Sequence, residues 1–87
     1  MMERARQPAH ILRNIPVRKI VKALEKDGFH LERKTRTGGH IYYHSDGRIT
    51  VVHYHKGSDT LTRKTLQSVL DAVRWSKEDL KRLGLLK

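Results

Sequence analysis

The sequence predicts an α+β fold of two layers in the order α-β-β-β-α, followed by a short C-terminal helix. Apolar residues recur at helical spacing in two separate segments, around residues 16–27 and 62–73. Between them lie three short runs with alternating side chains, two of which are joined by an Asp-Gly turn. Consecutive strands joined by short connections pair antiparallel, so we expect a three-stranded meander with both helices on one face.

The first helix is expected from about Pro16 to Asp27. Pro16 suits the first helical position because its missing N–H would have had no partner there, and Gly28 can take the left-handed conformation that ends a helix. Its apolar stripe consists of Val17, Ile20, Val21 and Leu24. The preceding residues 1–13 are basic and lack periodicity, so they are interpreted as a flexible arm ahead of one domain spanning residues 14–87.

Three strands are expected between the helices. The first follows Gly28 directly and should bury Phe29 and Leu31. The second, residues 40–44, places His40, Tyr42 and His44 on one face, and the third runs from Ile49 to Tyr54 after the turn at residues 45–47.

The remaining helices are predicted from their end signals. Thr62 is typical of an N-cap, with a hydrophobic staple between Leu61 and Leu66, so a second helix should start there and pack beside the first. The segment Ser76-Lys77-Glu78-Asp79 resembles a capping box, which predicts a short third helix that Gly84 could close. Trp75 is expected to pack this helix onto the domain.

Composition narrows the class of protein. Lysine and arginine number 19 against 9 acids, and a net charge of +10 on a small domain favours a nucleic-acid partner, although it also fits an acidic protein partner or solubility alone. The absence of cysteine excludes disulfides, thiolate zinc sites and cysteine nucleophiles. No apolar run reaches membrane-spanning length and residues 1–13 lack the apolar centre of a secretory signal, so we expect a cytoplasmic protein with no membrane partner.

Four of the six histidines and the Gly38-Gly39 pair lie within residues 35–55. His40 directly follows the two glycines, where an uncrowded backbone would let a large substrate approach, and its imidazole can act as a general base or acid near neutral pH. Lys34, Arg36 and Arg48 lie near the same loop and turn and could hold a phosphate. This combination predicts cleavage of RNA through its own 2′-hydroxyl, which requires proton transfer and charge stabilisation but no metal.

A second proton-transfer group is needed, and the sequence does not choose among His44, His55, Tyr42 and Lys56. In the second helix, Arg63, Lys64 and Arg74 are either a solvated face or further contacts to a phosphate backbone. The residues interpreted as binding RNA are Lys34, Arg36, Arg48, Lys56 and Lys64.

The histidine spacing also suggests zinc, because His53 and His55 are two apart and His40 and His44 are four apart on neighbouring strands. Asp46, in the turn, is the one acidic residue of the hairpin, and structural zinc sites have clearer spacing. We therefore expect no metal and no cofactor.

The chain resembles the HicA mRNA interferase family, the toxin half of HicA-HicB toxin-antitoxin pairs, over about residues 17–83. The resemblance rests on five segments in order: Val17 to Phe29, Gly39-His40-Ile41-Tyr42, His44 to Arg48, Lys64 to Leu70, and Trp75 to Leu80. It implies a fold like that of double-stranded RNA-binding domains, metal-independent endoribonuclease activity on mRNA, and neutralisation by a HicB-type antitoxin. The family's catalytic histidine lies in a Gly-Ser-His motif, whose closest counterpart is Gly38-Gly39-His40, so His40 inherits that role.

Two departures from the family pattern leave alternatives open. The family usually has five positions from its catalytic histidine to the histidine before the Asp-Gly turn, whereas His40 to His44 is four, so an ungapped alignment puts Gly39 at the catalytic place. Where the family often has proline and then histidine, this chain has His53-Tyr54-His55, which could compensate for a displaced histidine. The alternative functions are a non-catalytic RNA-binding module of the same fold and a protein-binding adaptor. The oligomeric state is not fixed by the sequence.

Overall fold

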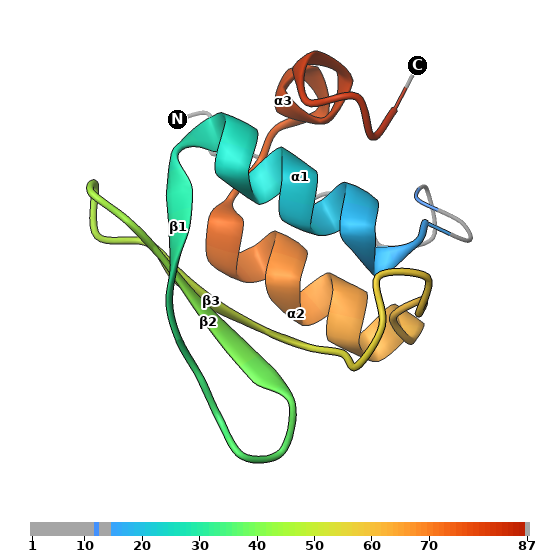
Figure 1. Ribbon diagram of the computed structural model, residues 1–87. Helices are drawn as coiled ribbons and strands as arrows, with labels where there is room; N and C mark the ends of the chain where they lie inside the picture. The colour runs from blue at the N-terminus through green and yellow to red at the C-terminus, as the bar shows by residue number, and fades with distance from the viewer. Residues whose placement is uncertain (1–11, 13–14, 87) are drawn as a thin grey trace.

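The computed structural model describes Leu12 and residues 15–86 (Figure 1). Its elements are α1 (Val17–Asp27), β1 (Phe29–Lys34), β2 (Gly39–His44), β3 (Ile49–His53), α2 (Arg63–Val73) and α3 (Lys77–Arg82). The strands form one antiparallel sheet in the order β1-β2-β3. This confirms the α-β-β-β-α fold with a short C-terminal helix. Most of the predicted N-terminal arm lies outside the described residues; Leu12, within it, is buried in the core.

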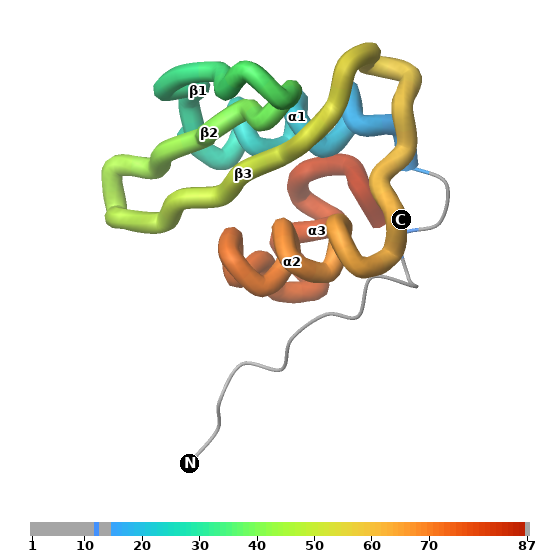
Figure 2. Tube along the Cα trace, turned by 90° about the horizontal axis from the view of Figure 1, so that it is seen from below, coloured from blue at the N-terminus to red at the C-terminus, as the bar shows by residue number. Residues whose placement is uncertain are grey.

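Both long helices cover the same face of the sheet, and α3 lies beyond them near α1 (Figures 1 and 2). The core fills the space between the helices and this face, where Tyr42 and Val52 are buried against the apolar stripes of α1 and α2. The opposite face carries no helix in the described part of the chain, and there Ile49 and Val51 are 52% and 40% exposed. The sheet therefore has one buried and one open side.

The helix ends largely follow the sequence signals. Gly28 has a left-handed φ of 105° at the end of α1, Thr62 accepts a hydrogen bond from the Thr65 N–H, and Ser76 and Asp79 form a complete capping box. Pro16, in contrast, is the N-cap of α1 rather than its first residue.

The start of α1 is capped by a distant loop. Pro16 has no side chain that can accept the free N–H groups of the first turn, so the backbone carbonyls of Asp59 and Gly57 do so, accepting from Val17 and Arg18 at 2.6 and 2.9 Å. Pro16 also forms a β-bridge with Thr60. These bonds fix the loop after β3 against α1.

The prediction that Leu31 is buried is wrong. Phe29 is buried as expected, but Leu31 is 42% exposed. Leu31 pairs with Tyr42 in the same register as Phe29 with His44, so it keeps the helix-facing side, but β1 is an edge strand with no neighbour beyond it. The error was therefore to equate the helix-facing side with burial at the edge of the sheet. A bulge follows, where the pairing skips one residue between Leu31 and Arg33.

Asp27, the last residue of α1, holds three parts of the fold together. Its carboxylate accepts from the Trp75 indole at 2.9 Å and pairs with Arg48 at 3.2 Å and Arg82 at 3.0 Å. Trp75 is buried and attaches the C-terminal segment, as predicted. Burial alone would raise the pKa of Asp27, but the hydrogen bonds from Trp75 and Arg82 and the charges of both arginines outweigh it, so the pKa lies below its ordinary value.

Candidate functional site at the Gly38-Gly39 end of the sheet

His40 faces the helix layer and is 9% exposed. Its ring stacks on Tyr54, with centroids 3.9 Å apart and planes 13° apart, and its Nδ1 lies 2.9 Å from the Gly38 carbonyl oxygen. A carbonyl only accepts, so Nδ1 carries a proton, and in the neutral ring Nε2 keeps the lone pair of a base. In the described residues, every fully buried side-chain nitrogen has a hydrogen-bond partner. Nε2 of His40 makes no hydrogen bond there, so it must retain contact with solvent.

The Gly38-Gly39 pair makes room for histidines rather than for substrate, which corrects the expectation of an uncrowded backbone. A Cβ on Gly39 would stand 2.7 Å from the Thr35 hydroxyl and 3.1 Å from Nε2 of His53. A Cβ on Gly38 would stand 3.0 Å from Cε1 of His55, and Gly38 has a left-handed φ of 89°. Three imidazoles therefore gather around two residues without side chains.

Gly39→Ala should destabilise this end of the sheet by about 1–3 kcal/mol, because the new methyl group meets the Thr35 hydroxyl, which already accepts from the Gly39 N–H at 2.9 Å. Urea unfolding followed by circular dichroism measures the loss. Adding Thr35→Ala removes the clashing atom and should recover part of it. A Gly39→Ala chain as stable as the wild type contradicts this packing.

The spacing between histidines decides which face they occupy. His40 and His44 are an even number apart, so both face the helices, whereas a five-residue spacing would put the two on opposite faces. The position five before His44 is Gly39, which pairs with His53 across β2 and β3 and shares the open face with it. The open face therefore presents an exposed imidazole from β3, and the helix-facing side presents His40 from β2.

The structure does not bring His44 to His40. The two Cα atoms are roughly 13 Å apart along the strand. Nδ1 of His44 accepts from the Asp46 N–H at 3.0 Å, and its Nε2–H donates to the Asp27 carbonyl at 2.8 Å. Both ring nitrogens are thus used to hold the β2–β3 turn against the end of α1.

Arg48 lies at that same far end. It pairs with Asp27 and Asp46, donates to the Val73 carbonyl, and lies over the Phe29 ring. An arginine with these partners and a mostly buried side chain stabilises the turn.

His55 is held close to the glycine pair by a loop of its own. The Asp59 carboxylate accepts from the backbone N–H groups of His55 and Lys56, each at 2.9 Å. These two bonds lower the pKa of Asp59. Both side chains are exposed, so the loop keeps the His55 imidazole available next to Gly38 and the Lys56 ammonium group available one residue further on.

Among the other predicted residues, Lys34 is the cross-strand partner of His40, and side chains of such partners share one face about 5 Å apart at Cβ. Arg36 is exposed in the loop between β1 and β2, and Lys64 is exposed in the first turn of α2. Tyr42 is buried, and burial, followed by its hydrogen bond with Tyr54, raises its pKa well above the ordinary value of a tyrosine. It therefore remains protonated and cannot serve as an anionic base.

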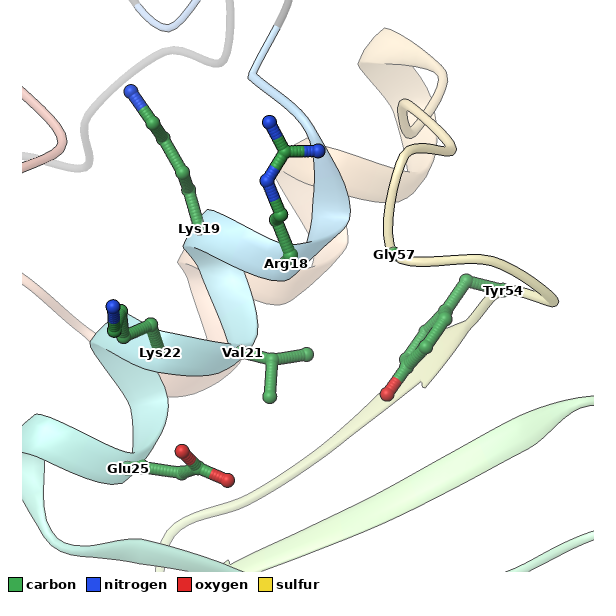
Figure 3. Close-up of a pocket in the computed structure, with 7 residues that line it drawn as sticks. All are labelled: Arg18, Lys19, Val21, Lys22, Glu25, Tyr54 and Gly57. Atoms are coloured by element: carbon green, nitrogen blue, oxygen red, sulfur yellow. The ribbon is translucent and has the colours of Figure 1, made fainter.

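Sequence reasoning missed a basic groove beside this end of the sheet. It lies between α1 and the loop after β3, has a volume of about 440 Å³, and is shown in Figure 3. Arg18, Lys19 and Lys22 contribute cations from α1, and Tyr54, whose ring also stacks on His40, lines the opposite side. The helical pattern had marked only the apolar residues of α1, and nothing in it indicates which loop lies opposite.

The fold and this site define a class, a small basic α+β domain of the double-stranded-RNA-binding type with histidines at one end of its sheet. A family model described as the HicA toxin of bacterial toxin-antitoxin matches residues 17–85, and the chain belongs to that family. No curated protein matches the chain. Among the described residues, no helix is both long and apolar enough to cross a membrane, and no three histidine or acidic side chains are placed to share a metal ion.

Proposed function

We propose that this HicA-family toxin is an endoribonuclease that cleaves mRNA in the cytoplasm by histidine acid-base chemistry. The observation that carries the proposal is the bond from His40 Nδ1–H to the Gly38 carbonyl, which fixes the tautomer and leaves Nε2 as a base. The Tyr54 ring and the strand hold the imidazole in place, and a positioned base is what proton transfer requires.

In the proposed reaction, Nε2 of His40 takes the proton of a ribose 2′-hydroxyl. The 2′-oxygen attacks the adjacent phosphorus, the bond from phosphorus to the 5′-oxygen breaks, and a 2′,3′-cyclic phosphate and a 5′-hydroxyl result. The departing 5′-oxygen takes a proton from a second group. We assign this to His55, since His44 is committed to the turn at the far end and Tyr42 is buried.

Charge on the reacting phosphate would be stabilised by Lys34, the cross-strand neighbour of His40, and by Arg36 in the adjacent loop. Lys56 and the cations of α1 would hold the flanking phosphates, and Lys64 lies at the start of the neighbouring helix. In this proposal Arg48 acts on stability rather than on RNA.

Arg18→Ala and Lys22→Ala should each weaken RNA binding for all sequences alike. If each cation neutralises one phosphate of a single strand, the slope of log K against log salt becomes shallower by about 0.7 per substitution. Fluorescence anisotropy of a labelled single strand in chelator, measured over a salt series, gives the slope. The matched control is Lys77→Ala, which removes the same charge from the start of α3, outside the groove, and should leave the slope unchanged. Equal slopes for all three variants rule out a phosphate path along α1.

A non-catalytic RNA-binding module remains the second candidate, and one observation favours it. His40 is 9% exposed and its ring stacks on Tyr54, so little of the imidazole is accessible to RNA. Incubation of the purified protein with RNA in chelator separates the two, because the module binds tightly and leaves the RNA intact.

The partner that neutralises the toxin is proposed to be a HicB-type antitoxin. A net charge of +10 favours an acidic surface on that partner, and the open sheet face with Ile49 and Val51 offers the apolar contact that protein interfaces use. Complex formation that blocks RNA binding in a competition assay would support masking of the basic groove.

A further inference from the structure

The groove beside His40 combines apolar walls, a basic rim and one acid. Val21 and the Tyr54 ring form the walls, and Figure 3 shows both pointing into the same space as the Glu25 carboxylate. Gly57 lacks a side chain at one side of the groove, and a Cβ there would stand 3.3 Å from Cβ of Arg18. A volume of about 440 Å³ is sufficient for a nucleobase with its ribose.

Glu25 is the feature that a simple phosphate track does not explain. It is the one acid among the residues that line the groove, and no hydrogen bond or ion pair joins its side chain to the part of the chain that the structure describes, although its charge acts on the buried Tyr42 hydroxyl. A carboxylate repels phosphate and only accepts hydrogen bonds. A ligand that reaches Glu25 must therefore present N–H or O–H donors at this point while its anionic part stays at the basic rim.

We propose that this groove is a guanine-binding subsite of the RNA site. Guanine carries two adjacent donors, N1–H and the N2 amino group, which match the two oxygens of a carboxylate, whereas uracil, cytosine and adenine offer donors at only one position of that edge. The base would lie between the Val21 methyl groups and the Tyr54 ring, because single-stranded RNA is recognised by stacking on aromatic side chains. Arg18 and Lys22 would hold the phosphates on either side.

The subsite lies next to the proposed chemistry and rests on the proposed function, since its ligand is the RNA that His40 would cut. Tyr54 lines the groove and also stacks on His40, so a base in the groove belongs to a nucleotide close to the reacting phosphate. Glu25 and Tyr54 would then set which position in the RNA is cleaved.

Binding can be measured without cleavage by using 2′-O-methyl RNA, which lacks the attacking hydroxyl. Labelled pentanucleotides UUXUU, with X as guanosine, inosine, adenosine, cytidine or uridine, are titrated with the wild-type chain by fluorescence anisotropy. We expect guanosine to bind at least about tenfold more tightly than uridine, because it forms a second hydrogen bond to a charged group. Inosine, which keeps N1–H and lacks the amino group, should fall between them.

Glu25→Gln should remove the advantage of guanosine over inosine, and Glu32→Gln, which removes the same charge from an exposed acid of β1 outside the groove, should preserve it. Tyr54→Leu should weaken the binding of all five ligands.

The subsite is overturned if the wild-type chain binds all five ligands with affinities within about twofold of one another, or if Glu25→Gln leaves the preference unchanged. A preference for guanosine without cleavage of ordinary RNA supports the guanine subsite and overturns the proposed nuclease activity. Cleavage without any preference supports the nuclease activity and overturns the subsite.

Discussion

His40→Ala should lower the rate of RNA cleavage by about 10²–10⁴-fold in the presence of chelator. The substitution removes the one ring whose tautomer is fixed by the Gly38 carbonyl and whose Nε2 is left as a base. Cleavage of an RNA with a fluorophore and a quencher at its two ends gives the rate. The natural comparison is His53→Ala, which removes the exposed imidazole on the opposite face of the sheet and should retain most of the activity.

Because His40 is largely buried, the alanine variant also loses packing against Tyr54. His40→Asn addresses this, since an amide N–H can donate to the Gly38 carbonyl while the side chain cannot act as a base. We expect it to melt nearer the wild type and to be equally inactive. If His53→Ala is inactive and both His40 variants cleave RNA, the base lies on the open face above Gly39. The proposed role of His40 would then be rejected.

Asp27→Ala should cost about 3–5 kcal/mol of the free energy of unfolding, enough to unfold many small domains. The carboxylate is 11% exposed, and its loss leaves the Trp75 indole without its partner and Arg48 beside a mostly buried cavity. Urea unfolding gives the change. Arg82→Ala removes only the exposed partner of the same carboxylate and should cost less than about 1 kcal/mol. Similar losses for the two variants would mean that the network does not depend on the buried contacts.

The same carboxylate predicts the direction of the pH dependence. Its folded pKa lies below its unfolded value of about 3.9, so its contribution to stability is complete above that value and disappears as the pH falls through the lowered folded pKa. Asp27→Asn, which has no charge to lose, should therefore differ less from the wild type at pH 3 than at pH 7. A difference that grows on acidification contradicts the lowered pKa.

The fold was predictable because its signals are local. Gly28, Thr62 and Ser76 each end or begin a helix by bonds to residues a few positions away, and alternation in β2 and β3 identifies the strands. Leu31 was assigned wrongly because its strand lies at the edge of the sheet, where a helix-facing side chain can still reach solvent. A single sequence does not display which strand is at the edge or how far the helices cover it.

The candidate site was less predictable because its contacts are distant in the chain. Nothing near His44 or Arg48 reveals that their partners include the Asp27 and Val73 carbonyls. The carbonyls of residues 57 and 59 cap α1 and hold the loop after β3 against it, and Tyr54 and Glu25 line the groove between these two segments. The Gly38-Gly39 pair was a possible signal for the imidazoles gathered around it. A position can require glycine because a ring packs against it, as well as because its backbone is left-handed.

The even spacing between His40 and His44 in β2 has an evolutionary consequence. One residue gained or lost between His40 and the turn would transfer every side chain before it to the other surface, whereas residues nearer the turn would stay in place. Relatives that differ by such an insertion would present an imidazole to opposite sides of the same scaffold while their sequences look alike. Strand length, rather than the identity of any side chain, would then be the heritable trait that decides where their chemistry takes place.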